Sequence, residues 1–347
     1  MTDENPALPV VAWLGLGAMG LPMVQRVVAA GYRVRAYDPH RERLDAAGAD
    51  YAAADPADAA RGAQVLVVMV ATPQQADEAL VGRGGLEALD PGARVVVLST
   101  VGTAWVKELA GRVPPGARVV DAPVSGGVVR ARDGSLLVMA SGLDAVSGAL
   151  LDTLGDVVEV GPDPGQGQAM KMVNQVLCGV HIAAAAEALA LAEALGLDPA
   201  RALETVRRGA GASFMLDDRG RRMVDPGTEV RSSLALFVKD LGLVADESRR
   251  GGITTGVAAA AARLFAEAAA ARGADHDEHR ALRLHAGAAR LVEVVAPGAL
   301  GRPTEQVHRL ARGDAGRVDP LERPQLDLVA VVLLEHRREV VATHVVG

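Results

Sequence analysis

Lysine is nearly absent from this chain, and its few positions are candidates for proton chemistry. The 347 residues include 36 basic side chains, and only Lys107, Lys171 and Lys239 among them are lysines. A buried amine can lose its proton near neutral pH, whereas a guanidinium stays charged. Lys171 and Lys239 lie in apolar segments and are the candidates for acid–base chemistry. Lys107 lies beside Glu108 on a predicted exposed helix and is assigned no role.

The segment around Lys171 predicts a polar face on a long apolar helix. Lys171, Asn174 and Gln175 are spaced i, i+3 and i+4, which puts them on one face. We expect Lys171 in the first helical turn, where desolvation and the positive end of the helix dipole lower its pKa. Such an amine can act as a general acid or base. The alternative is a lysine that keeps its charge in solvent above two capping amides.

The same helix, predicted over residues 168–196, is long enough to suggest a membrane span. It carries Lys171, Glu187 and Glu193 together with several amides. Charges at these depths are costly in lipid, so a helix buried inside the protein is the better interpretation.

A second candidate site follows the predicted strand at 118–120, in the run Asp-Ala-Pro-Val-Ser-Gly-Gly at 121–127. Gly126 and Gly127 allow the backbone to aim successive N–H groups at one point, which forms an anion-binding nest. The Ser125 hydroxyl would add a donor for a substrate carboxylate. A plain structural turn is the alternative for an isolated Ser-Gly-Gly.

Lys239 has apolar neighbours at helical spacing, so its charge is expected to point into a cleft or along a helix rim. No ion pair with Asp240 is expected, because adjacent residues on a helix point apart.

Residues 9–38 predict a strand, a glycine turn, a helix and a second strand, the order required by the dinucleotide-binding fingerprint. Asp38 lies 18 residues after Gly20, where a carboxylate accepts from ribose hydroxyls and repels a 2'-phosphate. NAD is therefore favoured, while Arg41 and Arg43 leave NADP possible. A purely structural turn is the alternative. The candidate diphosphate contacts are Gly15, Leu16, Gly17, Ala18, Met19 and Gly20.

Two more buried strands, at 64–70 and 94–98, continue the doubly wound pattern. Ligands of such sheets bind beyond the carboxyl ends of the strands. Candidate cofactor contacts there are Val70, Ala71, Gln75 and Thr100. Serine and threonine at such positions can also be simple helix caps.

Composition excludes several classes of protein. A net charge of −7 and a pI of about 5.7 argue against nucleic acid as a partner. The single Cys178 and the absence of a signal-like N-terminus predict a cytoplasmic protein. His276 and His279 suggest a solvated helix start, and no metal site is expected.

Four motifs together resemble the β-hydroxyacid dehydrogenase family, which includes 3-hydroxyisobutyrate dehydrogenase. They are Gly-Leu-Gly-Ala-Met-Gly-Leu-Pro-Met at 15–23, Asp-Ala-Pro-Val-Ser-Gly-Gly at 121–127, Gly-Gln-Ala-Met-Lys-Met-Val-Asn-Gln at 167–175 and Lys-Asp-Leu at 239–241. The segments at 179–188, 213–215 and 237–246 most resemble the L-threonate dehydrogenase branch.

The resemblance implies an α/β N-terminal Rossmann-type doubly wound sheet plus an all-α C-terminal domain, joined by a long interdomain helix. The expected domains are 9–163 for NAD(P), 164–290 for substrate and oligomerisation, and 291–347 as an atypical extension. Within that extension, residues 326–334 and 340–346 are predicted strands after a linker at 297–325.

The resemblance also implies roles for the candidate residues. Lys171 would be the general acid/base, and Ser125, Gly126 and Gly127 would hold the carboxylate. Asn174 and Gln175 would position the reacting hydroxyl, although many members carry Asn in place of Gln175. Lys239 would lie where cofactor and substrate meet.

The sequence thus predicts an NAD-dependent oxidoreductase of a small hydroxy acid, such as L-threonate, oxidised to the 2-oxo acid. Alternatives are 3-hydroxyisobutyrate or tartronate semialdehyde chemistry, and a non-catalytic NAD-binding interaction protein. A homodimer or homotetramer is expected, with neither a nucleic acid nor a membrane as partner.

Overall fold

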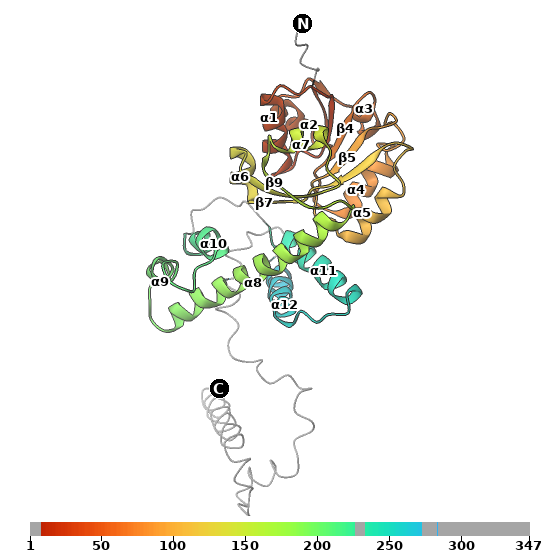
Figure 1. The fold of residues 1–347 in the computed structure, drawn as a ribbon. Coiled ribbons are helices and arrows are strands. Elements are labelled where there is room, and N and C mark those ends of the chain that lie inside the picture. Colours follow the sequence, from red (N-terminus) through yellow and green to blue (C-terminus); the bar gives the residue numbers. More distant parts are fainter. Residues whose placement is uncertain (1–7, 226–232, 273–282, 284–347) are drawn as a thin grey trace, which may run out of the picture. The chain divides into compact units, whose positions relative to one another are not determined.

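The computed structural model describes residues 8–225, 233–272 and 283 (Figure 1). Contacts divide the chain into two units, Met1–Ala288 and Ala289–Gly347. Every described residue belongs to the first unit. The strands predicted at 326–334 and 340–346, the predicted linker and the histidine pair at 276 and 279 lie outside the described residues.

A mostly parallel sheet forms the N-terminal half, as predicted. Its strand order is β3-β2-β1-β4-β5-β6-β8-β7, with β9 paired to β8. The central strands β1, β4 and β5 consist mostly of Val and Leu, together with Ala12, Trp13 and Arg94, and have no exposed positions, as expected for strands covered on both faces. The bounds are β1 Val11–Leu14, β2 Val34–Tyr37, β3 Tyr51–Ala52, β4 Val65–Val68, β5 Arg94–Val97, β6 Arg118–Asp121, β7 Val124–Ser125, β8 Leu136–Ser141 and β9 Gly155–Gly161.

Helices cover both faces of this sheet and create two apolar cores. One core lies under α1, α2, α6 and α7, and the other under α3, α4, η1 and α5. Alternate residues of each central strand enter opposite cores, for example Val11 one and Ala12 the other. The bounds are α1 Gly20–Ala29, α2 Arg41–Ala47, α3 Pro56–Ala60, α4 Pro73–Asp77, η1 Glu78–Gly82, α5 Thr103–Ala110, α6 Gly127–Asp133 and α7 Ala145–Leu151.

One edge of the sheet departs from the parallel pattern. β8 runs antiparallel to β6 and to β7, and β9 then runs parallel to β8. The Ser-Gly-Gly turn at 125–127 lies between β7 and β8, where the chain reverses direction.

A long helix leads from the sheet into an all-α half, also as predicted. Its apolar residues pack with α10, α11 and α12 in a third core, in which the rings of Phe237 and Phe265 stack at 5.1 Å. Among the described residues, α8 is long and apolar enough to cross a membrane, and half of its most apolar stretch is buried inside the protein. The bounds are α8 Gln166–Ala194, α9 Pro199–Val206, α10 Phe214–Val224, α11 Leu234–Arg250 and α12 Gly256–Arg272.

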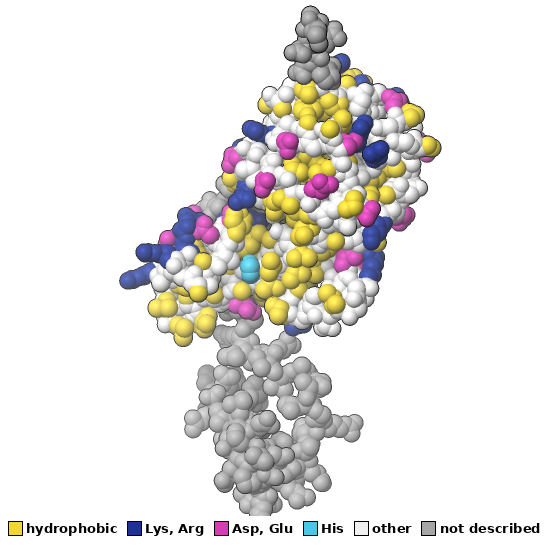
Figure 2. Space-filling view, in the orientation of Figure 1, with side chains coloured by type: hydrophobic (Ala, Val, Ile, Leu, Met, Phe, Trp, Pro, Cys, Tyr) yellow, Lys and Arg dark blue, Asp and Glu magenta, His cyan; other side chains and the backbone are white. Residues whose placement is uncertain are grey.

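Part of α8 still presents apolar side chains to solvent, namely Met170, Val173, Leu177 and Leu191. Figure 2 shows hydrophobic side chains gathered over the region that α8 occupies in Figure 1. The expected homo-oligomer stays a prediction.

Asp121, the last residue of β6, fixes where α8 begins. One carboxylate oxygen accepts from the backbone N–H groups of Gly165 (3.0 Å) and Gln168 (2.9 Å), and the other accepts from Gln168 Nε2 (2.9 Å). Gln168 in turn accepts from the amides of Val101 and Gly102 through its Oε1. Asp121 has no exposed surface, and this burial raises the pKa of its carboxyl group against the lowering effect of its donors. The carboxylate therefore ties the start of α8 to the carboxyl edge of the sheet.

We expect Asp121→Ala to destabilise the protein far more than loss of an ordinary helix cap. Two buried backbone N–H groups and one amide lose their acceptor, at about 1–3 kcal/mol for each unsatisfied group. Urea denaturation should therefore report a loss of at least about 3 kcal/mol in the free energy of unfolding.

Asp55→Ala is the matched control, because Asp55 caps α3 through the amide of Asp58 at a less buried position. Its loss should be about 1–2 kcal/mol. Equal losses in the two variants would contradict the role given to Asp121.

Candidate active site

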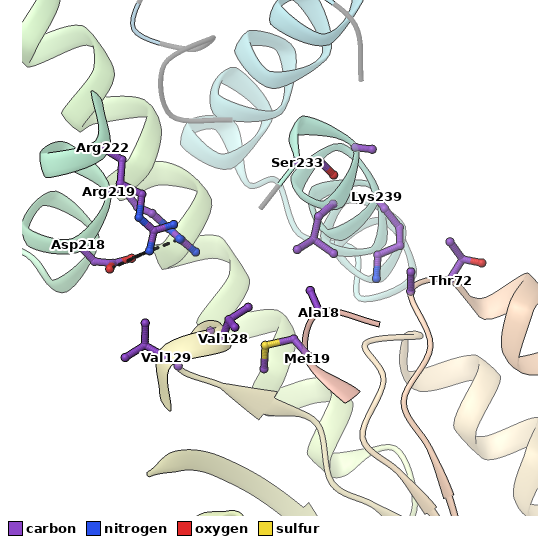
Figure 3. Close-up of a pocket in the computed structure, with 15 residues that line it drawn as sticks. Ala18, Met19, Thr72, Val128, Val129, Asp218, Arg219, Arg222, Ser233 and Lys239 are labelled. Atoms are coloured by element: carbon purple, nitrogen blue, oxygen red, sulfur yellow. Dashed lines mark hydrogen bonds and ion pairs between the residues drawn. The ribbon is translucent and has the colours of Figure 1, made fainter. Parts of the chain in front are cut away.

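A cavity of about 330 Å³ lies between the carboxyl edge of the sheet and the helical half. Figure 3 shows Lys239 and Thr72 on one side, the α10 side chains on the other, and Ala18 and Met19 between them. Six predicted site residues line it: Ala18, Met19, Ala71, Gly126, Gly127 and Lys239.

The glycine turn after β1 has the shape needed for a dinucleotide diphosphate. Gly15 has φ +99°, and a side chain there would collide with the Met69 carbonyl. A side chain on Gly20 would collide with the Gly15 carbonyl, so α1 packs tightly against the turn. At Gly17 a Cβ would meet nothing within 4 Å. Open space at this glycine, ahead of the α1 N-terminus, fits a diphosphate that approaches the backbone closely.

Asp38 lies at the end of β2 beside this turn. Its Oδ2 accepts from the amide of Leu16 (2.7 Å), and its Oδ1 accepts from the amide of His40 (2.9 Å). The Arg43 guanidinium approaches the same Oδ1 at 3.4 Å. The carboxylate is therefore held in place, and it can still accept from ribose hydroxyls through its remaining lone pairs.

Of the predicted contacts beyond the next strands, Ala71 lines the cavity, whereas Val70, Gln75 and Thr100 do not. Val70 donates its amide to Ser99 Oγ (2.8 Å), and Ala71 donates to Gln75 Oε1 (3.0 Å). The carbonyl of Thr100 accepts from Lys239 Nζ at 2.9 Å.

Lys171 is deeply buried, with 7% of its surface exposed, and its Nζ donates to the Val124 carbonyl at 2.8 Å. That carbonyl immediately precedes Ser125, so the amine lies next to the anion nest. Burial lowers the pKa of Lys171; the charge of Lys239 adds to the lowering, and Asp240 and Cys178 oppose it.

The predicted helical position of Lys171 was wrong in one respect. Because α8 begins at Gln166, Lys171 lies in the second turn rather than the first. The effect of the helix dipole falls off within the first turn, so desolvation is the main cause of the lowered pKa.

Asn174 and Gln175 connect the nest to α11. Ser125 Oγ donates to Asn174 Oδ1 at 3.4 Å, and Asn174 Nδ2 donates to Gln175 Oε1 at 2.8 Å. Gln175 Nε2 then donates to Asp240 Oδ2 at 2.5 Å. The i, i+3, i+4 face thus holds Lys171 and both amides together, as the spacing predicted.

The nest itself has the backbone that glycine allows. Gly126 and Gly127 have φ of +139° and +74°, and Gly126 caps the N-terminus of α6. Both residues line the cavity, so the backbone of this candidate anion nest is open to a ligand there.

The expectation that Lys239 and Asp240 make no ion pair was wrong. Their Nζ and Oδ1 atoms lie 2.9 Å apart. Adjacent Cβ atoms do point apart, but the four-carbon stem of lysine is long enough to bend back. Asp240 therefore connects Lys239 to Gln175, a role that the sequence reasoning missed although Asp240 stands in the Lys-Asp-Leu motif.

The sequence reasoning also missed the α10 residues Asp218, Arg219 and Arg222, which line the cavity. Their signal was a dense run of charges, Asp-Asp-Arg-Gly-Arg-Arg at 217–222, directly after the predicted segment at 213–215.

The cavity is lined by Ala18 and Met19 of the dinucleotide-binding turn and by the anion nest, whereas Lys171, Ser125, Asn174 and Gln175 lie behind the nest and do not line it. A dinucleotide-binding turn together with a buried lysine beside an anion nest is a feature of a nicotinamide-dependent hydroxyacid dehydrogenase. Comparison with known proteins agrees. Residues 10–160 match the NAD-binding domain of 6-phosphogluconate dehydrogenase, and residues 165–285 match the NAD-binding domain of NADP-dependent 3-hydroxyisobutyrate dehydrogenase.

Individual relatives are similar over most of the chain. An L-threonate dehydrogenase from Escherichia coli is 35% identical over 298 residues, which cover 83% of this chain and 97% of the relative. The 2-hydroxy-3-oxopropionate reductase of Escherichia coli is 30% identical over 78% of this chain and 95% of its own. The crystal structure of a 3-hydroxyisobutyrate dehydrogenase from Salmonella typhimurium has a TM-score of 0.74 at 34% identity, covering 79% of this chain and 99% of that one. The chain belongs to the 3-hydroxyisobutyrate dehydrogenase family of NAD(P)-dependent hydroxyacid dehydrogenases.

The lowered pKa of Lys171 predicts a pH-dependent contribution to stability. In the window between its folded-state pKa and the ordinary value of 10.5, the unfolded chain binds more protons than the folded one. The free energy of unfolding then rises with pH through that window. Relative to Lys171→Met, which cannot titrate, wild-type stability should increase as the pH is raised toward 10.5.

Urea denaturation of both proteins at a series of pH values measures this difference. Lys107→Met, at an exposed lysine, should give a nearly constant difference from the wild type. A constant difference for Lys171→Met as well would refute the lowered pKa.

Proposed function

We propose that this protein oxidises a four-carbon sugar acid of the L-threonate type at C2, with NAD as the preferred cofactor and Lys171 as the general base. The observation that carries the proposal is the buried Lys171 amine, 2.8 Å from the carbonyl that precedes the Ser-Gly-Gly nest. The similarity to L-threonate dehydrogenases over 83% of the chain supports the choice of substrate.

In this proposal the substrate carboxylate binds at the backbone N–H groups of Gly126 and Gly127, with the Ser125 hydroxyl as a further donor. The C2 hydroxyl lies against Lys171 and Asn174. The neutral amine of Lys171 takes the hydroxyl proton as the C2 hydride departs, and the product is the 2-oxo acid. When bound, the nicotinamide supplies the hydride acceptor.

The polar chain from Asn174 through Gln175 to Asp240 has a positioning role in this reaction. It fixes the orientation of the Asn174 amide, because Asn174 Nδ2 is held by Gln175 and Cys178. Lys239, anchored on the Thr100 carbonyl and on Asp240, supplies a positive charge at the cavity wall.

Two other substrates stay candidates within the same reaction class. The names of similar proteins include 3-hydroxyisobutyrate dehydrogenase and 2-hydroxy-3-oxopropionate reductase. Each of these substrates carries a carboxylate for the nest and a hydroxyl or carbonyl for Lys171, so steady-state kinetics with all three decide among them.

We expect Lys171→Met to lower kcat for L-threonate oxidation by about 10²- to 10⁴-fold, the typical contribution of a positioned acid or base. NAD affinity should change little, because Lys171 lies on the substrate side. NADH absorbance measures the turnover, and calorimetric titration with NAD measures the affinity.

Lys107→Met is the matched control, since it removes an exposed lysine of the same chain. Its kcat should equal that of the wild type. Full turnover in Lys171→Met would rule out the assigned role.

We also expect Asp38→Ala to shift cofactor preference toward NADP. Removal of the carboxylate eliminates its repulsion of a 2'-phosphate and leaves Arg43, now 3.4 Å from Asp38, able to receive that phosphate. Like-charge contacts of this kind cost several kcal/mol, so the ratio of kcat/KM for NADP over NAD should rise by about 100-fold.

Asp55→Ala removes a carboxylate that caps α3 in the same domain and should leave that ratio unchanged. An unchanged ratio in Asp38→Ala would show that cofactor choice depends on other residues.

A further inference from the structure

The helical wall of the cavity carries a charged group on α10 that the proposed reaction does not use. Arg222 Nη2 lies 3.0 and 3.1 Å from the two carboxylate oxygens of Asp218, and Arg219 Nη1 lies 3.3 Å from Asp218 Oδ2. All three residues line the cavity, across from Lys239 (Figure 3). We refer to Asp218, Arg219 and Arg222 as the α10 charge cluster.

The burial of its two arginines distinguishes this cluster from a surface ion pair, although the Asp218 side chain is 34% exposed. The side chains of Arg222 and Arg219 are only 8% and 12% exposed. The same helix provides the comparison, because Arg221 and Asp217 also pair at i, i+4 but are 54% and 48% exposed. Exposed pairs of that kind contribute little to stability. Burial of two guanidinium groups beside a cavity is costly, and it places their charge where a bound ligand can meet it.

The position of the cluster matches the end of the substrate remote from its carboxylate. The nest residues Gly126 and Gly127 and the α10 cluster line the same cavity. Lys171 lies next to the nest but does not line the cavity, so a substrate with its carboxylate in the nest and its C2 hydroxyl toward Lys171 would have its remaining carbons on the cavity side of the nest. The helical wall is where those carbons can meet protein.

The chemistry of the cluster suits hydroxyl groups. Asp218 offers acceptor oxygens and Arg219 offers N–H donors within one rigid arrangement. A vicinal pair of hydroxyls is both donor and acceptor and can satisfy both groups at once. An apolar tail would cover these charged groups without replacing their contacts with water.

We propose that Asp218 and Arg219, held in place by Arg222, bind the C3 and C4 hydroxyls of the substrate and so determine its specificity. This inference rests on the proposed function, because it assigns the carboxylate to the nest and the C2 hydroxyl to Lys171. Under this proposal the α10 charge cluster makes the protein prefer a polyhydroxy acid over an acid with a hydrocarbon tail.

The test compares two substrates that differ only in those hydroxyls. L-Threonate and the 2-hydroxybutyrate of the same C2 configuration share four carbons, the carboxylate and the C2 hydroxyl. The wild type should prefer L-threonate strongly. In Arg219→Met, kcat/KM for L-threonate should fall about 10- to 100-fold, as expected for lost hydrogen bonds to a charged group. The kcat/KM for 2-hydroxybutyrate should stay within about twofold of the wild-type value. The ratio of kcat/KM for L-threonate over that for 2-hydroxybutyrate should therefore fall.

Arg221→Met is the matched control, since it removes the exposed arginine of the same helix, and both kinetic values should stay at wild-type levels. Circular dichroism checks that the variants fold, and Arg219→Gln replaces Arg219→Met if the latter does not. An unchanged preference in a folded Arg219 variant would overturn the inference.

Two further outcomes are informative. If tartrate, which carries a second carboxylate at C4, loses more activity than L-threonate in the Arg219 variant, the cluster binds an anion and the hydroxyl assignment is wrong. If the wild type oxidises neither four-carbon acid, the proposed function itself has failed, and the inference fails with it. A different result, in which the wild type is active but the Arg219 variant keeps the same preference for L-threonate over 2-hydroxybutyrate, would overturn this inference alone.

Discussion

The contact between the Asp121 carboxylate and the start of α8 is the constraint on which the site depends. Asp121 ends β6, and the Ser-Gly-Gly turn follows within the next six residues of the chain. By accepting from Gly165 and Gln168, the same carboxylate places α8 against that turn. One further helical turn then brings Lys171 to the Val124 carbonyl. The distance between the amine and the nest therefore depends on the buried Asp121 carboxylate, on the Gln168 side chain bonded to it and on the helix that follows.

This arrangement buries two ionisable side chains, and each burial costs free energy. Asp121 and Lys171 are both buried, and burial shifts their pKa values in opposite directions, each toward the neutral form. At Asp121 several N–H donors offset the desolvation, which suits a residue that anchors structure. Lys171 has one described hydrogen bond, to a carbonyl. An amine with little support for its charge gives up its proton readily, which suits a residue that exchanges protons.

Much of the fold could be predicted from sequence because its signals are local. Buried strands, a glycine turn at the correct place and a helix-spaced Lys, Asn and Gln each follow from neighbours along the chain. The doubly wound sheet, the long helix and the family were confirmed. The edge at β8 was not predicted, because strand direction there depends on pairing between residues far apart in sequence. The Lys239–Asp240 pair was missed for a different reason, since Cβ direction was taken as a guide to where a long flexible side chain places its charge.

The residues on the sheet side of the cavity were easier to predict from the sequence than those on the helical side. On the sheet side the candidate binding groups belong to the backbone, at the glycine turn after β1 and at Gly126 and Gly127, so their sequence motifs are short and contiguous. The helical side is built on side chains from α10 and α11, whose direction becomes known only when the helices are packed. A backbone site binds what all substrates and cofactors of a family share, namely diphosphate and carboxylate. Side chains on a packed helix can be exchanged without disturbing that scaffold. Under the proposed function, substitutions at Asp218, Arg219 and Arg222 can therefore change substrate choice and leave the proposed role of Lys171 intact.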